Sequence, residues 1–283
     1  MTALLTAAQV EVFQRDGMLV IPNFYRRDDV EAVQRGIYDI IGRVMRQHGL
    51  AAERPAFAGE NFDAGYSQLI AVHRPWGGEV YDAVKQIPAF LRLVSLPEHE
   101  QLFRELRPKS APGVAGGGYG IRIDNPNEDK YRAMWHQEYP AQLRSVDGLV
   151  FWSPLVPVTL EMGPVSVCLG SHGEGALPVF NDDPGGAGRS GAYALRIANE
   201  SSYLARYLTA APLSSPTDLI VLDFMVLHAS GDNTSKRSRW SMQFRYFNFA
   251  DPIGTAHAWK GSYAAGVNFR LIHPELFVEN GKP

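Results

Sequence analysis

The sequence is poor in cysteine and has no long apolar run. Its 283 residues include a single cysteine, Cys168, so no intramolecular disulfide can form. This fits a reducing compartment, and we interpret Cys168 as a thiol of the core. No stretch reaches the roughly 18 apolar residues that a membrane span requires. The first residues carry neither a basic segment nor a long apolar run, so they do not resemble a secretory signal, and we expect a cytoplasmic protein.

An excess of basic residues is also lacking. The chain has 27 Lys and Arg against 30 Asp and Glu, which gives a formal net charge of −3 at pH 7. Without a basic excess to neutralise phosphates, non-specific binding of nucleic acid is not expected. Hydrophobic residues make up 45% of the chain and charged residues 20%, which is enough apolar material for a sizeable core.

The first part of the chain, residues 1–107, has mainly helical patterns. Thr6 is a plausible N-cap of a first helix that Gly17 ends, and the run "MLVIPNF" then predicts a short buried strand. Apolar residues near a 3.6-residue period predict a second, amphipathic helix that Gly49 ends. Further helices are expected over residues 79–93 and 97–107.

The second part, residues 108–283, has a different texture. Short β-rich runs alternate with turns rich in Gly, Pro, Asn and Asp, a pattern typical of an antiparallel sandwich or barrel. A polar insert near residues 179–193 predicts a surface loop or lid. We therefore expect one domain over residues 1–283, of the α+β class, with a helical layer followed by a β core.

The hexapeptide "WHQEYP" places a histidine and a carboxylate two positions apart, at His136 and Glu138. In a strand these side chains project from one face, so they could meet on one cation. His228 ends the apolar run "LIVLDFMVLH" and shares the parity of its inward residues if that strand is regular. Two imidazoles and a carboxylate form the facial triad of non-haem Fe(II) oxygenases, which leaves three positions open. On the residues alone, a zinc site or an exposed polar pair remains an alternative.

A polar strand face follows eleven residues after His228. In "RWSMQFRYFNF", Arg239, Ser241 and Gln243 share one face of the predicted strand. A polar face inside a small barrel needs a polar occupant, and a guanidinium can bind a carboxylate through two parallel hydrogen bonds. The alternative is an ordinary surface ion pair.

Four ordered segments resemble the phytanoyl-CoA dioxygenase family, within the Fe(II)/2-oxoglutarate-dependent oxygenases. They are "LTAAQVEVFQRDGMLVIPNF", "WHQEYP", "MGPVSVCLGSH" and "LHASGDNTSKRSRW". The third usually ends in Pro-Gly-Ser-His, and Leu169 replaces that proline here. The resemblance covers nearly the whole chain and is loose over residues 57–118. It implies a double-stranded β-helix, or jelly roll of the cupin type, with N-terminal helices packed on one sheet.

The resemblance also implies roles for single residues. Iron would be held by His136, Glu138 and His228, and 2-oxoglutarate would be bound by Arg239, Ser230 and Trp152. Trp152 could instead be a core aromatic, and we expect His172 to be structural. Most members have aspartate at the position of Glu138, whose extra methylene adds about 1.5 Å of reach. A carboxylate here argues against halogenation, because related halogenases lack it.

Candidates for substrate binding are less specific. Arg122 is the best of them for an anionic or polar group, and the others are Gln137, Tyr139 and Arg74. Each could instead be an ordinary packing or surface residue. No extended basic patch suggests a coenzyme A phosphate, so a small polar metabolite is expected.

The resemblance thus predicts a hydroxylase that uses Fe(II), with 2-oxoglutarate and O2 as cosubstrates, and releases succinate and CO2. Its partners would be a small-molecule substrate but neither nucleic acid nor membrane, and it would be a monomer or homodimer. Two other classes remain open: a jelly-roll binding or sensor protein without turnover, and a zinc-dependent hydrolase on a cupin-like barrel.

Overall fold

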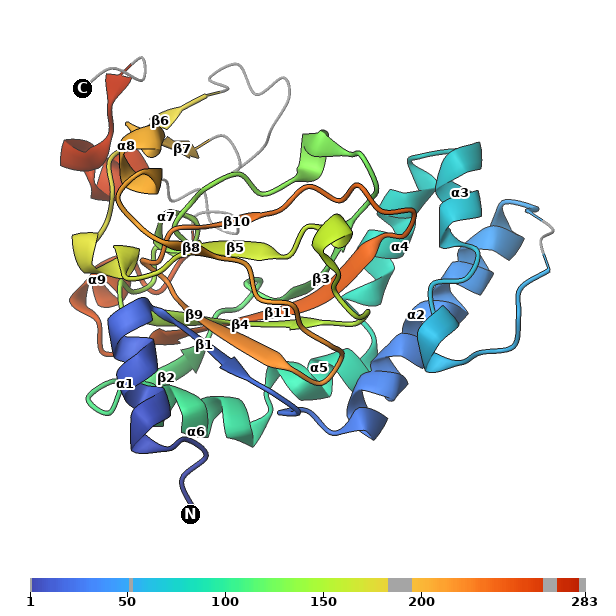
Figure 1. Cartoon of the computed structure of the whole chain (residues 1–283), viewed down its shortest axis with the longest axis horizontal. Coiled ribbons are helices and arrows are strands. Elements are labelled where there is room, and N and C mark those ends of the chain that lie inside the picture. The colour runs from blue at the N-terminus through green and yellow to red at the C-terminus, as the bar shows by residue number, and fades with distance from the viewer. Residues whose placement is uncertain (1, 51–52, 183–194, 262–268, 280–283) are drawn as a thin grey trace.

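Two antiparallel sheets face each other in the computed structural model, which describes residues 2–50, 53–182, 195–261 and 269–279 (Figure 1). The larger sheet has six strands, in the order β1-β9-β4-β11-β2, and β3 also pairs with β11. Its strands are β1 (Met18–Ile21), β2 (Pro112–Val114), β3 (Gly120–Asp124), β4 (Gly148–Pro154), β9 (Leu219–Asp223) and β11 (Arg239–Asn248).

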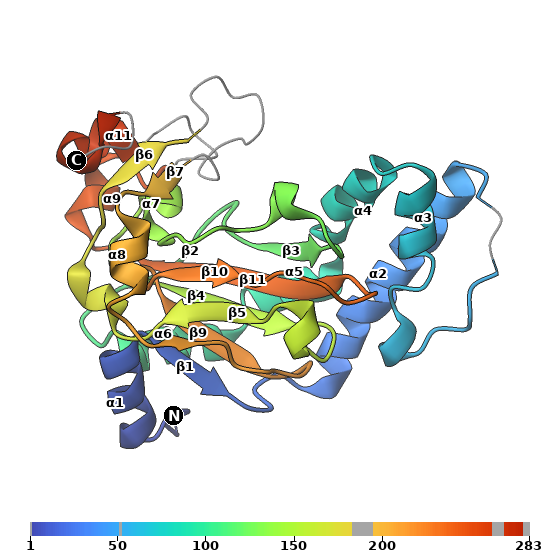
Figure 2. The same cartoon turned by 45° about the horizontal axis from the view of Figure 1, so that its top comes forward.

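The smaller sheet has the order β10-β5-β8 and lies opposite the larger one (Figure 2). Its strands are β5 (Val165–Cys168), β8 (Thr209–Ala210) and β10 (His228–Ser230). A separate two-stranded ribbon consists of β6 (Val179–Asn181) and β7 (Leu195–Ile197). This arrangement confirms the predicted double-stranded β-helix. The ribbon occupies the ends of the predicted insert, whose middle, residues 183–194, lies outside the described residues.

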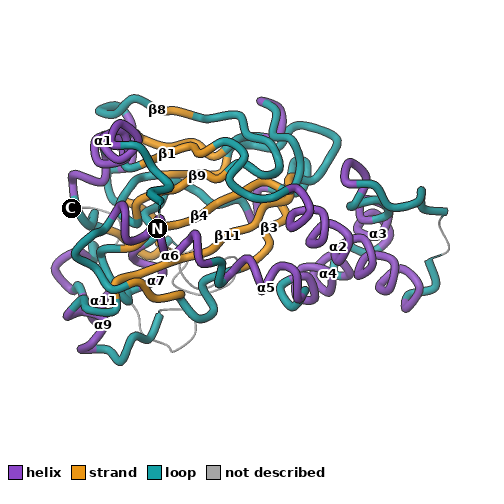
Figure 3. The backbone as a smooth tube through the Cα atoms, turned by 90° about the horizontal axis from the view of Figure 1, so that it is seen from below, coloured by secondary structure: helices purple, strands orange, loops and turns teal. Residues whose placement is uncertain are grey.

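Helices precede β2 along the chain, with β1 among them. They are α1 (Ala7–Asp16), α2 (Arg27–Gln47), α3 (Tyr66–Val72), α4 (Trp76–Val84), α5 (Pro88–Val94) and α6 (Pro97–Leu106). Figure 3 shows α5 and α6 along the larger sheet, whereas α3 and α4 lie beyond one end of its strands. Short helices follow within the β region: α7 (Tyr139–Gln142), α8 (Glu200–Leu204), α9 (Pro252–Ala256) and α11 (Phe269–Ile272). No helix in these described ranges combines the length and the apolar character needed to cross a bilayer.

Aromatic side chains join α5 and α6 to one face of the larger sheet. Phe90 of α5 stacks on Phe244 of β11 with ring centroids 5.5 Å apart, and His99 of α6 stacks on Phe151 of β4 at 4.7 Å. All four rings are fully buried. Because side chains alternate along a strand, packing Phe244 outward directs Gln243 and Arg245 to the inner face.

Cap residues set the first helix as predicted. Thr6 and Gln9 form a capping box, in which the Gln9 backbone N–H donates to Thr6 Oγ1 at 3.2 Å and Thr6 N–H donates back at 2.9 Å. Gly17 ends α1 with φ of 69°, a left-handed conformation that favours glycine. The single helix expected over residues 79–93 is wrong. α4 ends at Val84 and α5 begins at Pro88, because proline disfavours helical backbone in the residue before it.

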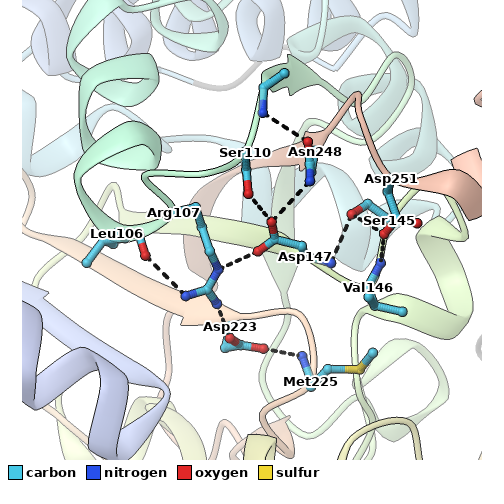
Figure 4. A network of polar contacts seen from close by, with 11 residues as sticks. Leu106, Arg107, Ser110, Ser145, Val146, Asp147, Asp223, Met225, Asn248 and Asp251 are labelled. Atoms are coloured by element: carbon cyan, nitrogen blue, oxygen red, sulfur yellow. Dashed lines mark hydrogen bonds and ion pairs between the residues drawn. The ribbon is translucent and has the colours of Figure 1, made fainter.

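A polar network ties several elements together at one end of the larger sheet (Figure 4). Arg107, which follows α6, donates from Nε to Asp147 at 2.6 Å and also pairs with Asp223 at the end of β9. Ser110 and Asn248 of β11 donate to the same Asp147 carboxylate. One guanidinium thus connects the helical layer to the ends of two central strands.

We expect Arg107→Gln to lower the free energy of unfolding by about 2–4 kcal/mol, because it leaves two carboxylates without their cation. The Asp223 side chain is only 8% exposed, so water replaces that partner poorly. Urea denaturation measures the change. The control is Arg104→Gln on the same helix, which breaks an exposed pair with Glu100 and should cost about 0–1 kcal/mol. Equal losses in both variants would contradict the role given to Arg107.

Candidate metal centre and its cavity

A reciprocal backbone pair brings two histidines together. His136 N–H donates to His228 O at 3.0 Å, and His228 N–H donates to His136 O at 3.0 Å. Residues directly opposite each other in an antiparallel pair project from the same face. The two imidazole rings accordingly lie with their centroids 4.2 Å apart. Backbone pairing therefore places both rings on one side of the chain.

Each of these rings has its Nδ1 bound to a backbone carbonyl two residues earlier. His136 Nδ1 lies 2.7 Å from Met134 O, and His228 Nδ1 lies 3.0 Å from Val226 O. A carbonyl oxygen only accepts, so each Nδ1 carries a hydrogen and each Nε2 keeps its lone pair. Burial lowers the pKa of His136, and burial together with the neighbouring His136 lowers the pKa of His228 to about 3. Both rings are neutral near pH 7, which is the state that binds metal.

Glu138 reaches the same point by a route that differs from the expected one. The prediction that a strand places His136 and Glu138 on one face is wrong, because Glu138 has φ −72° and ψ −32° and is the N-cap of α7. Its backbone N–H donates to Phe224 O at 2.9 Å, which fixes this turn. Glu138 Oε2 lies 4.0 Å from His228 Nε2. One ligand atom from each of the three residues lies within 4.8 Å of the others, so the group could hold a metal ion.

The Glu138 carboxylate is buried but anionic. Burial alone would raise the pKa of Glu138, but Arg245 outweighs that effect and lowers the pKa to about 2. Arg245 Nε donates to Oε1 at 2.7 Å, and Gln142 Nε2 donates to the same oxygen at 3.2 Å. The sequence reasoning missed both donors. Extending the alternation from Arg239 along the same strand would have identified Arg245.

The run "LIVLDFMVLH" does not form the single regular strand that was expected. β9 ends at Asp223 and β10 begins at His228, and the turn between them carries the chain from one sheet to the other. Asp223 Oδ1 accepts from Met225 N–H at 2.7 Å, and Leu227 N–H donates to Ser171 Oγ at 2.8 Å. These two bonds fix the turn that positions His228.

A cavity of about 270 Å³ opens beside the three residues, between the two sheets. The predicted residues Trp152, Ser230 and Arg122 line it, as do Gln243 and Arg245 of β11. Val179, Leu195 and Ile197 of the β6–β7 ribbon form another part of the wall. Residues far apart in the sequence thus enclose one space next to the candidate metal ligands.

Arg239 is fully buried at the start of β11, on the strand face of Gln243 and Arg245. The register of β3 and β11 places it opposite Asp124, to which its Nη2 donates at 2.8 Å. Arg122 holds the other oxygen of that carboxylate at 2.8 Å. Burial would raise the pKa of Asp124, but the two arginines outweigh burial and lower it. Within the described ranges, Arg239 Nε, Arg239 Nη1 and Ser241 Oγ have no hydrogen-bond partner.

Gln137 and Tyr139 flank Glu138 but have other contacts. Gln137 Nε2 donates to Gly175 O at 2.7 Å and to Met225 O at 2.6 Å, and its Oε1 accepts from Leu177 N–H at 2.8 Å. Although Gln137 borders the cavity, its amide thus joins three backbone groups. The Tyr139 hydroxyl lies 2.7 Å from His273 Nε2, and the side chain is fully buried.

Arg74 and His172 lie elsewhere. Arg74 forms a two-pronged pair with Glu128, at 2.6 and 2.7 Å, and does not line the cavity. His172 Nε2 lies 3.0 Å from Gln14 O of α1, as expected for a structural residue. Of the four substrate candidates, Arg122 and Gln137 line the cavity. The Arg122 guanidinium is held by Asp124 and also donates from Nη2 to Tyr131 O at 2.5 Å.

Comparison with known proteins gives a family match and several similar folds. The family model of phytanoyl-CoA dioxygenase (PhyH) matches residues 13–241. Among curated proteins no sequence matches. Similar solved structures include EctD from S. alaskensis with 2-oxoglutarate and 5-hydroxyectoine, at 18% identity and a TM-score of 0.57, covering 87% of this chain and 77% of that one.

Two further structures have comparable likeness. The α-ketoglutarate-dependent carbocyclase SnoK from nogalamycin biosynthesis is 17% identical with a TM-score of 0.57, and 87% of this chain and 85% of that one are covered. AviO1 from Streptomyces viridochromogenes Tue57 is 20% identical with a TM-score of 0.53, with 89% and 99% covered. At such low identity these likenesses establish the fold.

Metal binding should depend on the three converging side chains. After treatment with a chelator, the protein should bind one Mn(II) per chain. We expect His228→Ala and Glu138→Ala to weaken this binding by more than roughly 100-fold, because loss of a residue that only supports a metal ligand already costs about 10–100-fold. Glu138→Asp should retain measurable binding. Isothermal titration measures the dissociation constants. His48→Ala removes a histidine that pairs with Glu79 on the helical layer, and should bind like the wild type. Full affinity in Glu138→Ala would remove that carboxylate from the metal site.

Gln137→Leu tests whether that side chain is structural. Because it strips three backbone groups of a partner, we expect a loss of roughly 2–4 kcal/mol of unfolding free energy in urea titrations. If unfolding were unchanged while substrate binding was lost, Gln137 would be a substrate ligand.

Proposed function

The chain belongs to the phytanoyl-CoA dioxygenase family, whose model matches residues 13–241, and we propose that it hydroxylates a small polar metabolite. The family comprises non-haem iron enzymes that depend on 2-oxoglutarate. The observation that carries the proposal is the convergence of two neutral imidazoles and one anionic carboxylate beside a cavity. His136, Glu138 and His228 are the residues that would hold Fe(II).

The donor set fits iron of this kind. Two imidazole nitrogens and one carboxylate oxygen on one side of an ion leave the remaining octahedral positions for other ligands. The His136 and His228 Nδ1–H groups are bonded to backbone carbonyls, which orients each Nε2 and prevents the ring from turning. Zinc also accepts these donors, so the experiment below separates the two metals by their need for O2.

Arg239 and Ser241 fit a carboxylate of 2-oxoglutarate. Two guanidinium nitrogens and one hydroxyl are buried on the β11 face that these residues share, and have no hydrogen-bond partner among the residues that the structure describes. Leaving such groups unpaired costs free energy, and a carboxylate that accepts two parallel hydrogen bonds would satisfy them. Asp124 holds the guanidinium by its third nitrogen and so fixes the direction of the other two. Ser230 and Trp152 line the cavity together with the metal ligands, whereas Arg239 and Ser241 are not among its lining residues.

When bound, iron and 2-oxoglutarate supply the oxidising chemistry, in which one oxygen atom of O2 enters succinate as CO2 leaves, and the other enters a substrate C–H bond. The chain's own residues orient the reactants. Apolar side chains of the β6–β7 ribbon and Trp152 line the cavity, and such a wall would limit the access of water to a reactive step. Arg122, whose guanidinium is held by Asp124 and Tyr131 O, is a cation of the cavity wall that would face a polar or anionic group of the substrate.

The size and polarity of the cavity support a small substrate. Its volume of about 270 Å³ must accommodate part of the cosubstrate as well as the substrate, and its wall includes Arg122, Gln243 and Arg245. Glu138 keeps a carboxylate among the metal donors, which favours hydroxylation over transfer of a halide.

Turnover of 2-oxoglutarate should require Fe(II), O2 and Arg239. We expect succinate to form with Fe(II) and ascorbate and to disappear with EDTA. Arg239→Gln should raise the KM for 2-oxoglutarate by at least roughly 10–100-fold, because the loss of even one charge-assisted hydrogen bond costs about 1.5–3 kcal/mol. The KM for substrate should change much less.

Arg237→Gln is the control for that variant. It breaks a two-pronged pair with Asp63 two residues away and should leave both constants unchanged. Equal effects of Arg239→Gln on both substrates would contradict its role. Absence of succinate across a broad substrate panel would favour a binding protein, and activity restored by zinc without O2 would favour a hydrolase.

A further inference from the structure

Arg245 is a polar side chain of the cavity wall with several hydrogen-bond partners. From β11 it donates to both oxygens of Glu138, with Nε 2.7 Å from Oε1 and Nη2 3.3 Å from Oε2. Nη1 donates to Gly118 O at 3.1 Å, and Nη2 also reaches Gln243 Oε1 at 2.9 Å. Every nitrogen of the guanidinium is therefore engaged, which fixes its plane against the carboxylate.

The two oxygens of Glu138 are not equivalent. Oε1 accepts two hydrogen bonds, from Arg245 Nε at 2.7 Å and from Gln142 Nε2 at 3.2 Å. Oε2 has the longer contact with Arg245 and lies 4.0 Å from His228 Nε2. One oxygen is thus saturated with donors, and the other is directed toward the histidines.

Gln142 is itself held in one orientation. Its Oε1 accepts from Arg144 Nη1 at 2.9 Å, so its NH2 group is the end that points to Glu138. Arg144 is anchored in turn by Gly116 O at 2.7 Å and by Trp259 O at 3.0 Å. Gly116 O thus supports Gln142 through Arg144, and Gly118 O accepts directly from Arg245. A side chain at Gly118 has no room, because a Cβ there would lie 2.9 Å from Gln142 Oε1.

We propose that Arg245, together with Gln142, is a positioning residue that holds Glu138 as a one-oxygen metal ligand. This inference rests on the proposed metal centre. With Oε1 occupied by two donors, only Oε2 is available to the ion. A carboxylate that bound through both oxygens would take one of the positions that a cosubstrate or O2 needs. The saturated oxygen therefore keeps the open side of the ion open.

The same contacts account for glutamate at this position. Glutamate has one more rotatable bond than aspartate, and holding it in one conformation costs side-chain entropy. The donors on Oε1 offset that cost by selecting one conformation before metal arrives. An aspartate, about 1.5 Å shorter, would withdraw from the Arg245 fork. Glu138 and Arg245 should therefore depend on each other.

The positive charge of Arg245 should weaken metal binding, whereas its orientation of Glu138 should strengthen it. Because the two effects have opposite signs, metal titration can distinguish them. If the guanidinium affected metal only through its charge, its removal would tighten binding of a divalent cation. If it acts by orienting Glu138, both Arg245→Met and Arg245→Lys should weaken Mn(II) binding by roughly 10–100-fold, since lysine keeps the charge but loses the fork. Co(II) absorption in the visible range should change in both variants, because the coordination of the carboxylate changes.

The experiment uses the full chain and Mn(II) titration, with Arg74→Met as a matched control. That variant breaks an equally forked arginine–glutamate pair, with Glu128, outside the cavity lining and should bind Mn(II) like the wild type. Glu138→Asp should weaken binding in the wild-type background but cost much less in Arg245→Met. Gln142→Leu removes the second donor to Glu138 and leaves Arg245 in place. It should change the Co(II) spectrum in the same way, with a smaller loss of affinity. This variant keeps the inference testable if Arg245→Met does not fold.

Unchanged or tighter Mn(II) binding in the Arg245 variants, with a wild-type chain that binds normally, would overturn the positioning role and leave the proposed function standing. Additive losses in Arg245→Met and Glu138→Asp would also overturn it. A wild-type chain that binds neither Mn(II) nor Co(II) would overturn the proposed metal centre and this inference with it.

Discussion

The site depends on one backbone pairing, the reciprocal hydrogen bonds between His136 and His228. These two bonds hold the segment around His136 beside the start of β10. They put the two imidazoles on one face, with ring centroids 4.2 Å apart. Phe224 O then accepts from the N–H of Glu138, so the carboxylate is added from the turn that follows the same pair. Three side chains from two distant segments are thus assembled by main-chain bonds, which do not depend on the identity of the side chains.

The parts of this arrangement that the sequence predicted are those with regular local patterns. Along β11, a ten-residue strand, alternation correctly assigned Arg239, Ser241 and Gln243 to one face because nothing interrupts the pleat. Thr6 and Gly17 bounded the first helix because capping is local chemistry. The run ending at His228 was misjudged for the opposite reason. It is buried on both sides, so it has no polar alternation, and Asp223 was the one residue in it that indicated a turn.

The contacts of individual polar side chains were beyond prediction. Gln137, Tyr139 and Glu138 are consecutive, yet one joins backbone groups, one pairs with His273 and one faces the histidines. The difference arises because the chain leaves extended geometry at Glu138 and enters α7, which has a proline in its first turn. Arg245 has the same dependence on tertiary structure, since its partner lies on a segment that reaches it only after the sheets have formed.

The attachment of the β6–β7 ribbon separates two kinds of change that the protein can undergo. The ribbon contributes Val179, Leu195 and Ile197 to the cavity wall, yet hydrogen bonds of its main chain fasten it. Leu177 N–H, just before β6, donates to Gln137 Oε1, and Val278 N–H donates to Val179 O. The side chains of Val179, Leu195 and Ile197 can therefore be exchanged for others without removing either of these hydrogen bonds. In the proposed enzyme, the ribbon side chains that would face a substrate and the atoms that fasten the ribbon are therefore different atoms of the same segment.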